Sequence, residues 1–93
     1  MFVYIVNSCA NEFDDLGYDR PYPVFYSLSE KRAKKYFKKE KEKYANTLSN
    51  LLEQHPEFKD NEDYQINKDT ENYFKIYMGK WFYQLELNKV VLQ

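Results

Sequence analysis

Hydrophobic positions near the start of the chain follow a strand pattern rather than a helical one. Residues 2–6 form a continuous run of β-branched and aromatic side chains, which predicts a strand in the centre of a sheet. Residues 8–23 contain two prolines, a glycine and four acidic residues, a composition typical of a loop. Short strands are expected at residues 24–26 and 64–67.

A long amphipathic helix is predicted between these two short strands. Ser27 and Glu30 have the spacing of a capping box, in which the Ser27 hydroxyl accepts a hydrogen bond from the backbone N–H of Glu30. Apolar residues then recur at spacings of three, four or seven as far as His55. Pro56 is expected to end the helix near Gln54.

The predicted helix is longer than the predicted strands. A helix of about 27 residues is about 40 Å long, whereas strands of about five to seven residues span about 17–24 Å. About half of the helix is therefore expected to extend beyond the sheet. Residues 8–23, a bend near Asn46 or a second copy of the chain would cover this overhang, and the last of these predicts a homodimer.

The segment from residue 72 to residue 87 predicts a β-hairpin. Gly79-Lys80 is a two-residue type II′ turn sequence between two strands rich in aromatic side chains. If Met78 pairs with Trp81, one face of the hairpin is apolar and is expected to pack against the helix. The opposite face is expected to present three aromatic side chains among charged residues, namely Tyr73, Tyr77 and Phe82.

Together these elements predict an α+β fold with residues 1–93 in one domain. The expected architecture is a two-layer sandwich, in which one long helix packs on a mainly antiparallel sheet of four to five strands in the order β-β-α-β-β-β. A chain of 93 residues holds one core but no deep enclosed active site, because it buries only about 60–70% of its unfolded surface. The core is expected to contain Phe2, Tyr4, Phe37, Phe74, Ile76, Trp81 and Tyr83.

Composition removes several classes of site. With one cysteine, Cys9, and one histidine, His55, the chain has neither a disulfide framework nor a Cys/His metal cluster, and no cofactor or metal is expected. A Cys9-dependent activity is the remaining enzymatic alternative, and it is outweighed by structural roles for both residues. No apolar run approaches the length of about 20 residues that a membrane-spanning helix requires, so we expect a cytoplasmic protein without a membrane partner.

Charge is strongly segregated along the chain although the formal net charge is −1. Residues 30–44 contain eight basic and three acidic residues, whereas the segments before and after them are both acidic. The basic segment is interpreted in three ways: as the solvated face of a lysine-rich helix, as a contact for an acidic protein surface, or as a phosphate-binding surface for RNA or DNA. The nucleic-acid alternative assigns binding to Lys31, Arg32, Lys34, Lys35, Lys38 and Lys39, within the segment that ends at Lys43.

Aromatic and acidic residues outside the expected core predict a protein-binding surface. Tyrosine is enriched at binding surfaces because it offers rigid area with a polar tip. The acidic residues of segment 8–23 lack the spacing of a calcium loop, and they are interpreted as solubilising or as carboxylates presented where a partner expects phosphates. The predicted partner-binding residues are Tyr73, Tyr77, Phe82, Phe13, Tyr18, Asp14 and Asp15.

The order of these segments resembles small uncharacterised proteins carried by phages and mobile elements. The resemblance lies in Val3–Val6, in Val24–Ser27 leading into Ser29–Tyr36, in the closing hairpin and in a composition rich in Lys, Asn, Tyr and Phe. This size class includes anti-CRISPR proteins, which inhibit a defence complex by binding it. The resemblance implies a non-enzymatic viral inhibitor that binds a host or defence protein complex in the host cytoplasm, and it assigns no residue role.

Overall fold

The strands lie at both ends of the chain and one long helix lies between them. The computed structural model describes residues 1–10 and 22–92. The predicted binding residues Phe13, Asp14, Asp15 and Tyr18 lie outside the described residues. The described elements are β1 (Phe2–Ala10), β2 (Tyr22–Ser27), α1 (Glu30–Gln54), the short 3-10 helix η2 (Pro56–Phe58), β3 (Tyr64–Asp69), β4 (Tyr73–Met78) and β5 (Trp81–Val91).

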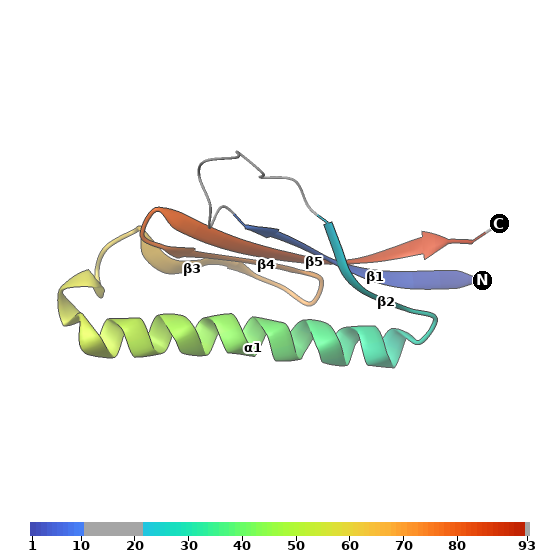
Figure 1. Cartoon of the computed structure of the whole chain (residues 1–93), viewed down its shortest axis with the longest axis horizontal. Coiled ribbons are helices and arrows are strands. Elements are labelled where there is room, and N and C mark those ends of the chain that lie inside the picture. The colour runs from blue at the N-terminus through green and yellow to red at the C-terminus, as the bar shows by residue number, and fades with distance from the viewer. Residues whose placement is uncertain (11–21, 93) are drawn as a thin grey trace.

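The five strands form one sheet in the order β2-β1-β5-β4-β3, and every neighbouring pair is antiparallel. α1 runs along one face of this sheet, and both ends of the chain lie at the end of the molecule where α1 begins (Figure 1). The α+β fold of one helix on an antiparallel sheet is therefore confirmed. The first and last strands, β1 and β5, are neighbours in the centre of the sheet.

The β4–β5 hairpin has the register that the sequence predicts. Met78 pairs with Trp81, and the pairs continue along the two strands as far as Tyr73 and Glu86. Gly79 has a φ of 72°, and it is the only residue with positive φ among those the structure describes. Because Lys80 has negative φ, the turn is of type II′ rather than type I′.

The predicted start of the helix is wrong by two residues. The N-cap is Ser29, whose Oγ accepts a hydrogen bond of 3.3 Å from the N–H of Arg32. Ser27 ends β2 and pairs with Tyr4, and its Oγ accepts from the N–H of Ser29 at 3.0 Å. Sheet pairing therefore holds Ser27 in an extended strand, and the capping box expected from its spacing to Glu30 does not form.

The predicted overhang of the helix is also wrong, because the central strands are longer than expected. β1 has 9 residues and β5 has 11, so they extend over about 30 Å and 37 Å. α1 has 25 residues and a length of about 37 Å. Helix and sheet therefore match in length, and the overhang no longer supports a homodimer.

The core lies between α1 and the middle of the sheet. Among the described residues, the buried cluster consists of Val6, Phe37, Leu48, Phe74, Ile76, Met78 and Leu85. Two residues predicted for the core are exposed instead, Phe2 at 42% and Trp81 at 44%. Both lie at ends of the sheet, since Phe2 pairs with Val91 near the chain termini and Trp81 follows the hairpin turn.

Candidate functional site

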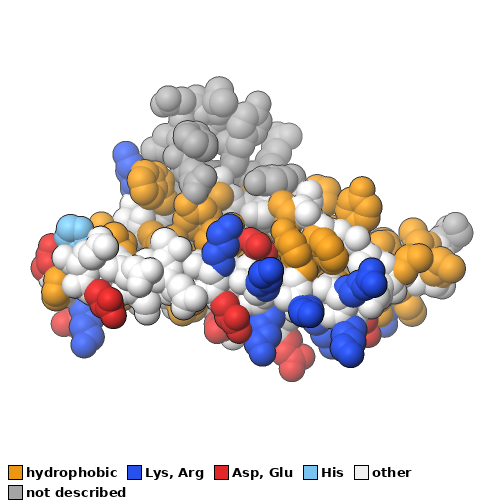
Figure 2. Space-filling model, turned by 60° about the horizontal axis from the view of Figure 1, so that its bottom comes forward, with side chains coloured by type: hydrophobic (Ala, Val, Ile, Leu, Met, Phe, Trp, Pro, Cys, Tyr) orange, Lys and Arg blue, Asp and Glu red, His pale blue; other side chains and the backbone are white. Residues whose placement is uncertain are grey.

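Six basic residues predicted to bind nucleic acid lie together on the N-terminal half of α1. All six are exposed, and Figure 2 shows the Lys and Arg side chains gathered over this part of the helix, bordered by hydrophobic side chains. The six are Lys31, Arg32, Lys34, Lys35, Lys38 and Lys39. The structure therefore brings this predicted set onto one surface.

Two basic residues of α1 form ion pairs with acidic neighbours. Nζ of Lys34 lies 2.9 Å from Oε1 of Glu30, and this hydrogen bond raises the pKa of Lys34. Nζ of Lys41 lies 2.7 Å from Oδ1 of Asp69 on β3. Within residues 1–10 and 22–92, no ion pair is formed by Lys31, Arg32, Lys35, Lys38, Lys39 or Lys43.

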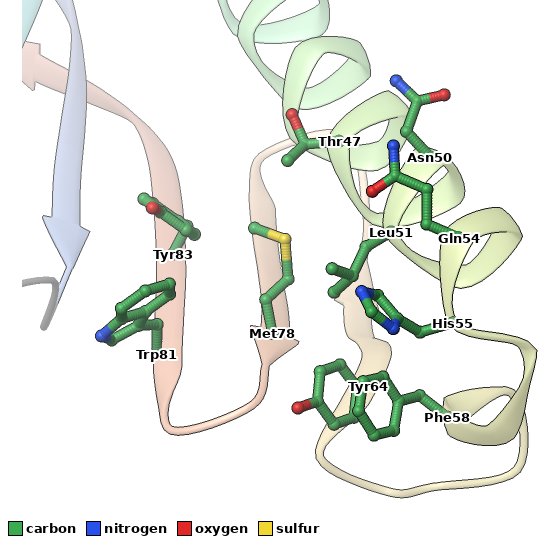
Figure 3. Close-up of a pocket in the computed structure, with 10 residues that line it drawn as sticks. All are labelled: Thr47, Asn50, Leu51, Gln54, His55, Phe58, Tyr64, Met78, Trp81 and Tyr83. Atoms are coloured by element: carbon green, nitrogen blue, oxygen red, sulfur yellow. The ribbon is translucent and has the colours of Figure 1, made fainter.

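An aromatic groove of about 470 Å³ lies at the C-terminal end of α1, where the β4–β5 turn and η2 meet the helix. Trp81 and Tyr83 on β5 form one side, and Phe58 and Tyr64 form the other (Figure 3). The Phe58 and Tyr64 rings are stacked with centroids 4.2 Å apart and planes at 1°. Each of these two rings therefore covers one face of the other, and Trp81 across the groove is 44% exposed.

The floor and rim of the aromatic groove differ in polarity. Leu51 and Met78 lie between the aromatic walls and provide an apolar floor (Figure 3). Thr47, Asn50 and Gln54 come from α1 and add hydroxyl and amide groups along the rim. The arrangement suits a flat or apolar group whose edge carries hydrogen-bonding atoms.

Three of the basic residues share one side of α1 with the groove rim. Arg32, Lys39 and Lys43 are separated by seven and four residues, and Thr47, Asn50 and Gln54 follow at intervals of four, three and four. Residues three, four or seven apart lie on the same side of a helix. We call this row the α1 flank, and it leads from three cations to the rim of the groove.

A second groove, of about 490 Å³, lies on the other side of α1. Lys34, Lys38 and Lys41 line it from the helix. Asp69 at the end of β3 and Glu71 in the following turn line its other side. Because acids and bases face each other here, this groove has much of its charge compensated internally.

The three aromatic residues predicted on the outer hairpin face do lie on the side of the sheet away from α1. Tyr77 pairs with Phe82, and the ammonium of Lys75 lies 5.3 Å and 5.1 Å from their ring centroids. The ammonium of Lys68 lies 4.9 Å from the ring centroid of Tyr73. All three rings are half-buried, so they present less area than the sequence interpretation assumed.

Cys9 and His55 lie on opposite sides of the sheet. Cys9 is buried, pairs with Gln84 and, by alternation along β1, faces away from α1. His55 caps the C-terminus of α1 and lines the aromatic groove. Among the described residues, no group of three or more His, Cys, Asp or Glu side chains is placed to hold a metal ion.

The end of the β1–β5 pair forms an exposed apolar surface. Beyond Leu87, the remaining residues of β5 pair with β1 alone, because the pairing with β4 stops at Glu86. Exposed large hydrophobic residues at this end are Met1, Phe2, Val90, Val91 and Leu92. We call these five residues the strand-end patch.

The aromatic groove was not predicted from the sequence. Alternation along β5 places Trp81 on the helix-facing side, and that assignment is correct, but Trp81 lies where α1 is ending. The helix stop at Pro56 and the turn at Gly79 were both visible in the sequence. Their proximity was not, because it depends on how far α1 extends along the sheet.

The described part of the chain contains no helix that is both long and apolar enough to cross a membrane. Comparison of the chain with known protein families, with curated proteins and with solved structures finds no match.

Proposed function

We propose that this chain is a non-enzymatic binding protein that holds a macromolecular partner along the α1 flank and in the aromatic groove. The observation that carries the proposal is the continuity between the two, since the row of cations ends at the rim of an open groove lined by aromatic side chains. Such a surface offers long-range attraction at one end and an apolar anchoring site at the other.

Trp81 is the anchor of this proposed site. Tryptophan is among the residues that contribute most to binding energy, and it does so where the partner excludes water from it. Trp81 is 44% exposed in the free chain, and an occupant of the groove would cover it. Phe58 and Tyr64 across the groove would enclose the same occupant.

We further propose that the partner is a host protein or nucleoprotein complex and that the chain inhibits it by occupying its surface. What supports this narrower proposal is the resemblance of the sequence to accessory proteins of phages, among them the anti-CRISPR class. The proposed mode needs no chemistry, because a bound chain blocks the surface that it covers.

The experiment is capture of the partner by the tagged chain from a lysate of the host cell, followed by mass spectrometry. We expect one complex in near-stoichiometric amount with the unchanged chain and loss of that complex with Trp81→Ala. Tyr26→Ala is the matched control, because Tyr26 is an aromatic residue that is 71% exposed on β2, away from the groove. Equal capture by all three chains would contradict the proposal.

A second candidate function is direct binding of RNA or DNA by the basic residues of α1. The observation that favours it is that six exposed cations of α1 form no ion pair with any described residue. These six are Lys31, Arg32, Lys35, Lys38, Lys39 and Lys43. Charge reversal at Lys38 and Lys39 is expected to abolish a mobility shift that also weakens steeply with salt. Absence of any shift for the unchanged chain at low salt would eliminate this function.

The homodimer remains a proposal, and the strand-end patch is the surface that we assign to it. Val91 presents an open strand edge beside exposed Val90 and Leu92, and such edges pair with further strands. Light scattering over a range of concentrations tests this. The mass should double at high concentration and return to that of a monomer in Val91→Lys.

A further inference from the structure

We propose that the α1 flank and the aromatic groove bind an unpaired nucleic-acid strand, with its phosphates along Arg32, Lys39 and Lys43 and one base stacked in the groove against Trp81. The inference rests on the proposed binding function and names the chemical class of the element that is bound. The strand is free, or it is part of the nucleoprotein complex that the chain captures.

The dimensions of the α1 flank suit a strand that leads a base into the groove. Arg32 and Lys43 are 11 residues apart, which is about 16 Å along the helix axis. Gln54 lies about 16 Å beyond Lys43 at the far end of the groove rim. The cations therefore precede the groove along one line. Thr47, the first residue of the groove rim, lies one helical turn after Lys43, and its hydroxyl donates a hydrogen bond of 3.0 Å to the Lys43 carbonyl.

The two sides of α1 differ in how many of their cations are in ion pairs, and this difference favours a polyanion on the α1 flank. On the other side, Lys34 and Lys41 are paired with Glu30 and Asp69, and Glu71 lines the same groove. On the α1 flank, the three cations form no ion pair with a described residue. A phosphate backbone therefore finds uncompensated positive charge beside the aromatic groove.

Two of the three cations on the α1 flank are lysines, and lysines in a row fit a repeating phosphate backbone better than a peptide. Lysine acts as a point charge without bidentate geometry, and phosphates repeat along a strand whatever its sequence. An acidic peptide would need carboxylates at matching intervals as well as an apolar anchor. The nucleic-acid strand supplies both elements in every nucleotide, a charged phosphate and a flat base.

The groove selects an unpaired base over a paired one. Trp81 lies on one side of it and the stacked Phe58 and Tyr64 rings on the other, and aromatic side chains stack on bases of any type. A base inside a duplex already has both faces covered by its neighbours. Asn50 and Gln54 at the rim carry amide donors and acceptors that match the hydrogen-bonding edge of an unpaired base (Figure 3).

The first experiment uses a fluorescein-labelled 15-mer of deoxythymidine and follows its anisotropy at low salt. A second titration uses the unlabelled 15-mer and follows the intrinsic fluorescence of Trp81, the single tryptophan of the chain. We expect binding together with quenching of Trp81, because a stacked base contacts the indole directly. The logarithm of the affinity should fall with the logarithm of salt at a slope of about −2, since a single strand contributes about −0.7 for each of the phosphates at Arg32, Lys39 and Lys43.

Two sets of variants locate the site. Lys39→Glu with Lys43→Glu is expected to weaken binding at least tenfold, whereas Lys34→Glu with Lys38→Glu makes the same charge change at the second groove, on the other side of α1, and should weaken it less than threefold. Trp81→Phe keeps a stacking ring and should retain binding that Trp81→Ala loses. Circular dichroism of each variant verifies that it is folded.

Three results would overturn the inference. One is binding of a duplex of the same length as tightly as the single strand. Another is a rise in anisotropy without any change in Trp81 fluorescence. The third is failure of the 15-mer to bind at low salt while a glutamate-rich peptide carrying one phenylalanine binds and quenches Trp81. In that third case, the proposed binding function would still stand if the chain captured a complex from the host lysate and Trp81→Ala failed to capture it.

Discussion

The hydroxyl of Tyr4 on β1 donates a hydrogen bond of 3.2 Å to Oε2 of Glu30, the first residue of α1. The other carboxylate oxygen, Oε1, lies 2.9 Å from Nζ of Lys34 one turn along the helix. The hydrogen bond and charge of Lys34, followed by the hydrogen bond from Tyr4, lower the pKa of Glu30. Glu30 therefore links the start of the helix to the sheet in its ionised form.

The lowered pKa of Glu30 predicts a loss of stability in acid. Because folding favours the ionised carboxylate, its contribution is present above the pKa of the unfolded chain and is lost as pH falls through the lower folded-state pKa. Tyr4→Phe should raise the pKa of Glu30 toward its ordinary value. NMR titration of the Glu30 side-chain carboxyl in both chains measures this, and a Glu30 titration left unchanged by Tyr4→Phe would refute the prediction.

Ser29 is expected to contribute to stability as the cap of α1. Ser29→Ala should lower the free energy of unfolding by about 0.5–2 kcal/mol, because the N–H of Arg32 loses its acceptor. Urea denaturation measures the change. Ser29→Asp should retain the cap, and Ser49→Ala at an exposed position within the C-terminal part of the helix should be neutral or slightly stabilising. A loss for Ser49→Ala as large as that for Ser29→Ala would argue against the cap.

Gly79 is expected to resist substitution for two reasons. Its φ of 72° is unfavourable for side chains, and a Cβ at this position would lie 3.1 Å from the hydroxyl of Tyr64. Gly79→Ala should destabilise the chain by about 1–2 kcal/mol, measured by thermal unfolding. Gly79→Asn brings the same Cβ but tolerates positive φ better, so it should cost less. Equal costs would assign the whole effect to the contact with Tyr64.

Ile66 and Ile76 provide a matched test of where the core lies. The two residues are paired across β3 and β4, yet Ile76 is fully buried and Ile66 is 43% exposed. Ile76→Val should lower the free energy of unfolding by about 0.5–1.5 kcal/mol, and Ile66→Val by less than about 0.5 kcal/mol. Chemical denaturation of both variants gives the comparison. A larger effect at Ile66 would place the core nearer to the β3 edge.

Local chemistry made the hairpin predictable. The Gly79-Lys80 turn fixes which residues face each other, and alternation then assigns every side chain of β4 and β5 to one of two faces. The helix stop at Gln54 was predictable for a similar reason, because Pro56 acts on its immediate neighbours. The basic surface of α1 follows from the same helical periodicity.

The helix start shows where local patterns fail. Ser27 and Ser29 are equally good caps by residue type, and the choice between them depends on how far β2 continues beside β1. Ser27 pairs with Tyr4, a residue more than twenty positions earlier in the chain. No spacing within the segment encodes that contact.

By itself, the sequence determined the element types, the hairpin register, the amphipathic helix and its basic first half. The tertiary structure decided that β1 and β5 pair in the centre of the sheet and extend to the length of α1, that Trp81 is left exposed at the groove, and that three cations lead toward it. The reason is that periodicity reports the side chains of neighbouring residues. Pairing of the first strand with the last is made by backbone hydrogen bonds, whose donors and acceptors are nearly the same at every position.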